Sequence, residues 1–133
     1  MAIDYGTKRI GIAVTDPLKM IANSLTTVES KEIIGFLTDY LKKEEVECLV
    51  IGQPFNLDNT DSEMEHNIQA FLVNLKIVFP EIKIERIDER FTSKIAQRTI
   101  IDAGIKKMDR RDKSLADKVS AAIILQTYLE INQ

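Results

Sequence analysis

The sequence has one cysteine, one histidine and only short apolar runs among its 133 residues. A lone cysteine, Cys48, cannot form a disulfide within the chain, which is typical of proteins in a reducing compartment. No apolar run approaches the roughly 20 residues that span a bilayer, and the N-terminus lacks the basic and then apolar pattern of a signal peptide. We therefore expect a cytoplasmic protein that does not enter a membrane.

The same scarcity narrows the possible chemistry. Cys48 and His66 are the only soft metal ligands, which argues against a zinc site. Cys48 lies in an apolar run and is expected in the core. His66 follows Glu63 and Glu65 at a charged helix start and is expected on the surface. No activated nucleophile or cofactor-binding loop stands out, so carboxylates are the best candidates for chemistry.

Length and composition indicate one globular domain. A chain of 15.1 kDa with 44% hydrophobic and 29% charged residues can bury a core without disulfides or a structural metal. We therefore interpret residues 1–133 as a single domain. The net charge of −3 and the pI of about 5.2 do not by themselves indicate a nucleic-acid-binding protein.

Two local clusters of basic residues depart from this average. One closely follows Asp4, and the other places five basic residues within positions 106–113. Such a run is often a solvated surface loop, but it can also neutralise the phosphates of a nucleic acid. The candidate nucleic-acid contacts are Lys8, Arg9, Arg90, Lys106, Lys107, Arg110, Arg111 and Lys113.

Hydrophobic periodicity predicts three strands at the start of the chain. Residues 9–15 alternate at period two, with the end of a strand at 1–4 before them and another strand at 24–28 after them. Because the links are short, these strands should be antiparallel neighbours.

The rest of the chain alternates helices with strands. Ser30 can cap a helix whose apolar positions recur at helical spacing as far as Leu41. The further elements predicted are a strand at 48–51, a helix at 61–78, a strand at 82–87, a helix at 93–102 and a helix at 114–129. Strands joined through helices should lie parallel to one another. The predicted fold class is α/β, with a mixed five-stranded sheet flanked by helices.

Parallel strands would bring acidic residues together. The carboxyl ends of the first, fourth and fifth strands would share one edge of the sheet, where open α/β sheets bind ligands. That edge would hold Asp4, the turn that begins at Gly52, and the pair Asp88 and Glu89. The sequence therefore predicts a site for a divalent cation there.

A third acid, Asp117, stands at the start of the final helix. That helix is apolar nearly all round, so we expect it to be buried and to carry Asp117 toward the domain body. A carboxylate in such a place costs free energy unless a cation or a hydrogen-bond donor meets it.

Each acid also has a structural explanation. Asp4 precedes a Tyr-Gly pair and could simply shape a turn. Asp88 or Glu89 could pair with Arg86 or Arg90. Asp117 has the spacing of a capping box with the serine at 114, and an acid in the first helical turn also suits the helix dipole.

Four segments together resemble the YqgF family of RNase H-like nucleases, whose members are named Holliday junction resolvases or pre-16S rRNA nucleases. They are DYGTKRIGIAV at residues 4–14, IGQPFNLD at 51–58, DERFTS at 88–93 and DKVSAAIILQTYL at 117–129. The segments occur in the family's order and span nearly the whole chain. The chain departs from the family pattern at Gln53 and Phe91, where leucine is common, and at Asn59, where glycine is common. None of these departures removes a carboxylate.

The resemblance implies an RNase H-like fold and a metal-dependent nuclease. Carried over position by position, the catalytic residues and metal ligands are Asp4, Glu89 and Asp117, with Asp88 as the alternative to Glu89. Mg²⁺ or Mn²⁺ suits such oxygen ligands, and two ions with substrate bound would clamp the scissile phosphate. The implied partner is a nucleic acid.

Several functions remain open at this point. We favour processing of the 5′ end of pre-16S rRNA, because a junction resolvase normally needs two active sites and no dimer face is evident in the sequence. A monomer or weak homodimer is expected. Holliday junction resolution and non-catalytic RNA binding are the alternatives. Residues 4–8 also resemble the first phosphate loop of actin-like and sugar-kinase ATPases, but those proteins generally need two such lobes.

Overall fold

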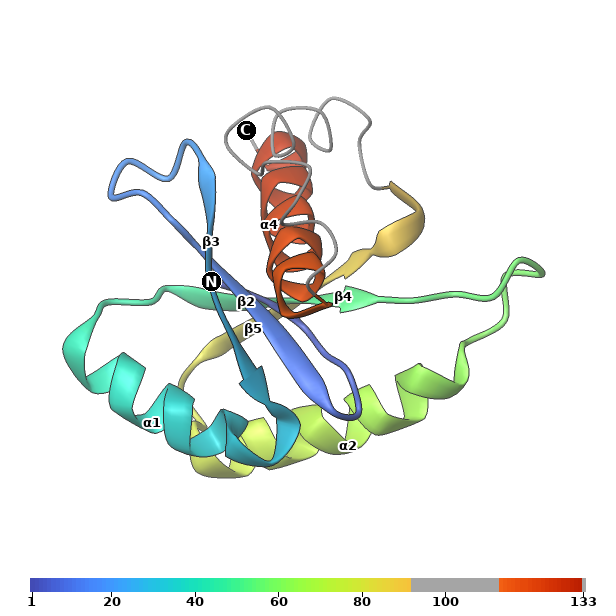
Figure 1. Ribbon diagram of the computed structural model, residues 1–133, viewed down its shortest axis with the longest axis horizontal. Coiled ribbons are helices and arrows are strands. Elements are labelled where there is room, and N and C mark those ends of the chain that lie inside the picture. Colours follow the sequence, from blue (N-terminus) through green and yellow to red (C-terminus); the bar gives the residue numbers. More distant parts are fainter. Residues whose placement is uncertain (92–112, 133) are drawn as a thin grey trace.

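A five-stranded sheet lies between helices on both faces in the computed structural model, which describes the backbone of residues 1–91 and 113–132 and the side chains of 1–90 and 119–132. The strands are β1 (Ala2–Asp4), β2 (Arg9–Thr15), β3 (Ala22–Glu29), β4 (Cys48–Gln53) and β5 (Lys83–Asp88). The helices are α1 (Ile33–Lys43), α2 (Glu63–Val78) and α4 (Lys113–Ile131), with 3₁₀ turns η1 (Ser30–Glu32) and η2 (Glu89–Phe91). Helices α1 and α2 lie on one face of the sheet, and α4 crosses the other (Figure 1).

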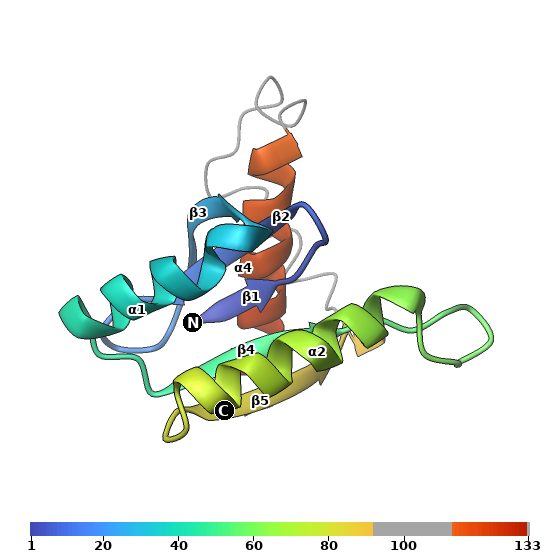
Figure 2. The same cartoon turned by 90° about the horizontal axis from the view of Figure 1, so that it is seen from below.

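The strand order is β3-β2-β1-β4-β5. The first three strands are antiparallel neighbours, whereas β4 runs parallel to both β1 and β5. This arrangement confirms the predicted mixed sheet and is consistent with an RNase H-like fold. Helix α2 runs along β4 and β5 when the molecule is seen from below (Figure 2). The carboxyl ends of β1, β4 and β5 therefore share one edge, as the sequence predicted.

Two apolar layers hold the sheet between its helices. Successive residues of a strand point to opposite faces, so each central strand contributes to both layers. The layer toward α1 and α2 includes Ile3, Ile12, Leu37, Ile51, Ile68 and Leu75, all almost fully buried. The layer toward α4 includes Ala2, Ala13, Val50, Ala121, Ala122 and Leu125. The small alanines of this second layer let α4 approach the sheet closely.

The start of α1 differs from the prediction. Ser30 does not cap the helix, since its hydroxyl donates instead to the carbonyl oxygen of Gly6 at 2.5 Å, and α1 has no side-chain cap. The Ser30 N–H also donates to the carbonyl oxygen of Lys8 at 3.0 Å. These two bonds tie the end of β3 to the turn after β1, which a helix cap would not have done.

Strand β4 is longer than predicted. It continues past Ile51 to Gln53, because β5 pairs with it as far as Gln53 opposite Asp88. Cys48, at its start, is only partly buried, and its thiol donates to the Tyr128 hydroxyl at 3.9 Å. His66 is exposed on α2, as predicted.

The C-terminal part of the chain agrees with the prediction where it is described. Helix α4 spans Lys113–Ile131 and thus includes the predicted helix at 114–129. The helix predicted at 93–102 lies outside the described residues. Within the parts of the chain that the structure describes, no helix is both long and apolar enough to cross a membrane.

Replacement of Leu75 by alanine tests the layer beneath α2. Leu75 is fully buried, so Leu75→Ala should lower the free energy of unfolding by about 2–5 kcal/mol, measured by urea denaturation. Val73, two residues away on the same helix, is 60% exposed. Val73→Ala should therefore change the free energy of unfolding by less than about 0.5 kcal/mol. Equal losses in the two variants would contradict the packing described.

Candidate active site

The edge formed by the carboxyl ends of β1, β4 and β5 carries the candidate site. Asp4 is the last residue of β1 and is half-buried. It lies one position beyond the pair Ile3 and Ile51, so its neighbour across the sheet is Gly52 of β4. Because neighbouring strands lie about 4.8 Å apart, the Asp4 backbone runs directly beside Gly52.

The carboxylate of Asp4 lies on the α4 face of the sheet. Its neighbours Ile3 and Tyr5 both pack toward the α2 face, where the Tyr5 ring stacks on Phe71 with centroids 4.9 Å apart. Ala2 belongs to the layer toward α4. Since side chains alternate along a strand, Asp4 shares the face of Ala2.

Gly52 provides the space in which the second acid lies. A Cβ atom built at Gly52 would be 2.7 Å from Oε1 of Glu89 and 2.9 Å from Cδ1 of Ile124 on α4. Both distances are shorter than van der Waals contact, so a side chain at position 52 would have to displace both groups. The Glu89 carboxylate therefore packs against the bare backbone of β4, next to the strand that carries Asp4.

Burial changes the acidity of Glu89. The loss of hydration raises the pKa of its carboxyl group, and the negative charges of Asp88 and Glu65 raise it further, while Arg86 opposes them. The site thus disfavours an additional negative charge. A bound cation would reverse this effect, because it favours the ionised carboxylate.

Asp88, the alternative ligand, has a different environment. The side chain of Arg90 donates to it through Nε at 3.0 Å and through Nη2 at 2.6 Å, and the Arg90 backbone N–H donates at 2.9 Å. These bonds hold the pKa of the Asp88 carboxyl below its ordinary value. Of the structural explanations considered above, pairing with a neighbouring arginine is thus the one that Asp88 adopts.

Arg90 also holds the loop between β4 and α2. Its Nη1 donates to the side chain of Asn59, and its guanidinium lies 4.1 Å from the centroid of the Phe55 ring. Asn59 adopts a φ of 70°, where the family usually has glycine, and asparagine tolerates this left-handed conformation better than most residues. Arg90 remains a predicted nucleic-acid contact, but its side chain already organises this loop.

Asp117, the third predicted ligand, lies in α4, but its side chain is outside the described residues. The same holds for Lys113, and the positions of Lys106, Lys107, Arg110 and Arg111 fall in the segment that is not described. Among the described side chains, no group of three or more histidines, cysteines or acids is close enough to hold a metal ion. Asp4 and Glu89, two of the three predicted ligands, thus lie at one strand edge, and the ligand roles of all three acids, Asp117 included, remain predictions.

The two predicted contacts near the N-terminus line a shallow cavity of about 460 Å³. Lys8 contributes to it from the β1–β2 turn, Arg9 from the start of β2 and Lys31 from η1. All three side chains are exposed. Sequence reasoning missed Lys31, because only the pairing of Arg9 with Glu29 brings the end of β3 beside this turn.

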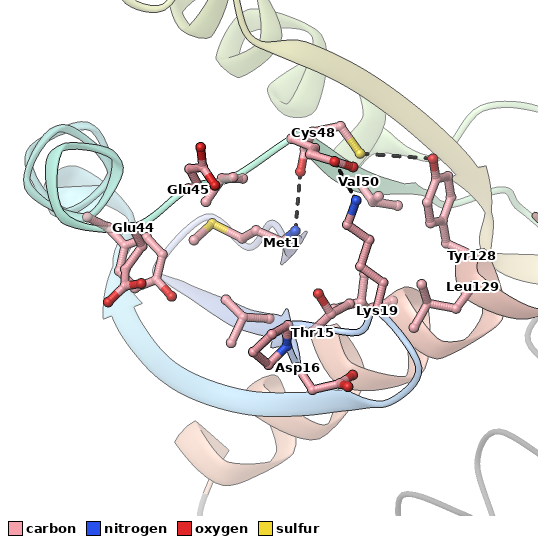
Figure 3. A pocket seen from close by; sticks show the side chains of 16 residues that line it. Met1, Thr15, Asp16, Lys19, Glu44, Glu45, Cys48, Val50, Tyr128 and Leu129 are labelled. Atoms are coloured by element: carbon pink, nitrogen blue, oxygen red, sulfur yellow. Dashed lines mark hydrogen bonds and ion pairs between the residues drawn. The ribbon is translucent and has the colours of Figure 1, made fainter.

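A larger cavity of about 530 Å³ lies at the opposite edge of the sheet. Its walls include Met1, Thr15, Cys48 and Tyr128, where a hydrogen bond joins the amine of Met1 to the carbonyl of Cys48 (Figure 3). Met1 and Cys48 lie at the amino ends of β1 and β4, whereas Asp4 and the Glu89 carboxylate lie at the carboxyl ends of the same strands. This cavity is therefore separate from the candidate active site.

The pairing of Asp88 with Arg90 predicts a pH-dependent effect of Asp88→Asn. A carboxyl group whose pKa is lowered on folding stabilises the folded state above its ordinary pKa of 3.8, and this stabilisation is lost as pH falls through the lower folded-state value. Asp88→Asn should therefore be less stable than the unchanged protein at pH 7, with the difference shrinking below about pH 4. Urea denaturation over pH 2.5–7 measures it, and a difference independent of pH would contradict the pairing.

Comparisons with known proteins identify the family to which the chain belongs. A family model described as "RuvX: Holliday junction resolvase" matches residues 1–131. A protein of Christiangramia forsetii is 57% identical over 129 residues, covering 97% of this chain and 96% of its own. Proteins of Porphyromonas gingivalis and Bacteroides thetaiotaomicron are 55% and 54% identical over 130 residues, each covering 98% of this chain and 94% of its own. All three carry the name "Putative pre-16S rRNA nuclease". The match over nearly the whole length, together with the acids at the shared strand edge, shows that the chain belongs to the RuvX/YqgF family of nucleases.

Proposed function

We propose that this protein is a divalent-metal-dependent nuclease that processes the 5′ end of pre-16S rRNA. The observation that carries the proposal is the placement of the Glu89 carboxylate against Gly52, in the strand next to Asp4. Two acids far apart in the sequence thus lie at the carboxyl ends of neighbouring strands, the edge of an open α/β sheet where ligands bind. The names of close relatives support the choice of substrate.

The residues present fit Mg²⁺ or Mn²⁺. These ions prefer carboxylate oxygens, and Asp4 and Glu89 offer them on one face of the sheet, with Asp117 as the third ligand from α4. The raised pKa of Glu89 fits a group that is meant to face a cation. When bound, such ions activate water and stabilise the charge that develops at the scissile phosphate.

The protein's own residues would bind and orient the substrate. Lys8 and Arg9 line one exposed cavity near the end of β1 and can neutralise phosphates that flank the scissile bond. Lys31 lines the same cavity but pairs with Glu29 at 3.3 Å. Affinity should then fall as the salt concentration rises. Asp88 is already neutralised by Arg90, so Glu89 is the better candidate for the ligand in this segment.

Holliday junction resolution is the second candidate, since the description of the family model names it. A resolvase cuts two strands and so needs two active sites, normally supplied by a dimer. The candidate site described here lies within one chain, which is sufficient for cleavage of a single RNA strand. The two functions therefore differ in the assembly that they require.

Replacing Asp4 by asparagine tests the proposed nuclease directly. Asp4→Asn preserves size but removes a charge needed to hold the ion, so cleavage of an RNA with the 5′ leader of pre-16S rRNA should fall at least about 100-fold. Glu89→Gln should have the same effect, whereas Asp88→Asn should retain most of the activity. A four-way DNA junction is assayed in parallel with Mn²⁺ or Mg²⁺.

Each outcome of this assay has a meaning. RNA cleavage that depends on Asp4 and Glu89 would support rRNA processing, and paired nicks in the junction would favour the resolvase. Full activity of Asp4→Asn would contradict the proposed active site. Tight RNA binding without any cleavage would favour a non-catalytic role.

Substitution of Gly52 tests the packing of Glu89. The added methyl group of Gly52→Ala must displace both the Glu89 carboxylate and the Cδ1 methyl of Ile124, each of which is the flexible end of a side chain. The protein should therefore still fold, while its cleavage rate falls by up to about 100-fold. Gly35 in α1 has open space around its Cβ position, so Gly35→Ala should leave the rate unchanged and stabilise the helix by about 0.5–1 kcal/mol. An unchanged rate in Gly52→Ala would contradict the arrangement.

A further inference from the structure

A largely buried ion pair, Arg86 with Glu65, adjoins the strand end that carries the candidate active site. Arg86 of β5 donates to Glu65 of α2 through Nη2 at 2.7 Å and through Nη1 at 2.9 Å. Glu65 is 4% exposed, and Gln69 donates to the same carboxylate at 2.7 Å. Neither Arg86 nor Glu65 was singled out as a site residue from the sequence.

The same arginine also binds the end of β4. Its Nε donates to the carbonyl oxygen of Ile51 at 3.2 Å, and its Nη2 donates to that of Gly52 at 2.9 Å. Arg86 thus holds two consecutive carbonyl groups of the strand end. The Glu89 carboxylate packs where a Cβ atom of residue 52 would lie. Gly52 therefore contacts both Arg86 of β5 and Glu89 of η2.

Helix α2 gives up a local interaction to make this pair. Ser62 precedes the helix and Glu65 is its third residue, which is the spacing of a capping box. The Glu65 carboxylate does not complete this box, because it accepts from Arg86 and Gln69 instead. The Glu65 backbone N–H donates to the carbonyl oxygen of Ser62 at 3.0 Å rather than to its hydroxyl, so no side-chain cap forms. The Ser62 hydroxyl is buried without a hydrogen-bond partner in the part of the chain that the structure describes. The Glu65 carboxylate therefore serves the contact with β5 rather than the start of its own helix.

We propose that Arg86, anchored by Glu65, is a positioning residue that fixes the end of β4 so that the Glu89 carboxylate lies where the catalytic ion needs it. Its planar guanidinium serves four acceptor atoms at once, two on Glu65 and two on the β4 backbone. A lysine could keep the charge pair with Glu65 but could not hold both carbonyl groups in one geometry. The inference rests on the proposed function, since it gives Glu89 a role in holding the metal.

The test compares Arg86→Lys with the unchanged protein. We expect the catalytic rate on the pre-16S leader RNA to fall about 10–100-fold, which is the usual loss when a residue that orients a metal ligand is replaced. KM should stay within about twofold. KM is spared because the phosphate contacts of Lys8 and Arg9 are untouched. Calorimetric titration with Mn²⁺ alone should show a weaker affinity by a similar factor.

A destabilised control separates positioning from stability. Leu75→Ala weakens the core beneath α2 but removes none of the hydrogen bonds that Arg86 makes. It should therefore keep its rate and its Mn²⁺ affinity at a temperature well below its midpoint of unfolding. If Arg86→Lys does not fold, the double variant Glu65→Gln/Arg86→Gln takes its place, because it removes both buried charges and leaves side chains of similar polarity.

The outcomes distinguish this inference from the proposed function. A loss of rate and of Mn²⁺ affinity in the Arg86 variant but not in Leu75→Ala supports the positioning role. Equal rates and affinities in the Arg86 variant and the unchanged protein, or losses in both variants that follow the unfolded fraction, overturn the positioning role alone. If the unchanged protein neither cleaves the RNA nor binds Mn²⁺, the proposed function fails and the inference fails with it.

Discussion

The contact between the Glu89 carboxylate and the backbone of Gly52 is the constraint on which the rest of the site depends. It requires a position without a side chain at the end of β4 and a β5 that runs parallel in the observed register, with Gln53 opposite Asp88. It also requires Ile124 of α4 to close the space from above. Strand register, helix packing and a single glycine therefore meet at one point.

Asp88 and Glu89 are adjacent in the sequence but have different electrostatic environments. Asp88 is neutralised by Arg90, which in turn holds the β4–α2 loop through Asn59 and Phe55. Glu89 turns to the α4 face, where burial raises its pKa. Asp88 is therefore a structural carboxylate, whereas the adjacent Glu89 is suited to hold a cation. The two side chains differ because the chain leaves β5 after Asp88 and enters η2 at Glu89.

Much of this arrangement follows from local patterns. Period-two alternation predicted the strands, helical spacing predicted α1 and α2, and the order of elements predicted the parallel edge that gathers Asp4 and Glu89. The failures have local physical reasons. Ser30 bonds the turn after β1 rather than α1, and β4 continues to Gln53 because pairing with β5 outweighs the turn tendency of a glycine. No pattern in the sequence indicated that Arg86 pairs with Glu65.

The sequence by itself determined the class of the fold and the family, and it indicated the candidate acids, since periodicity and short motifs are properties of neighbouring residues. Only the tertiary structure decided which acid of the pair turns to Gly52, which arginine neutralises the other, and how Arg86 holds the end of β4. Those choices depend on contacts such as Arg86 with Glu65, 21 positions apart, which form only when α2 packs on the sheet. Geometry across the fold, rather than residue type, assigns each charge its role.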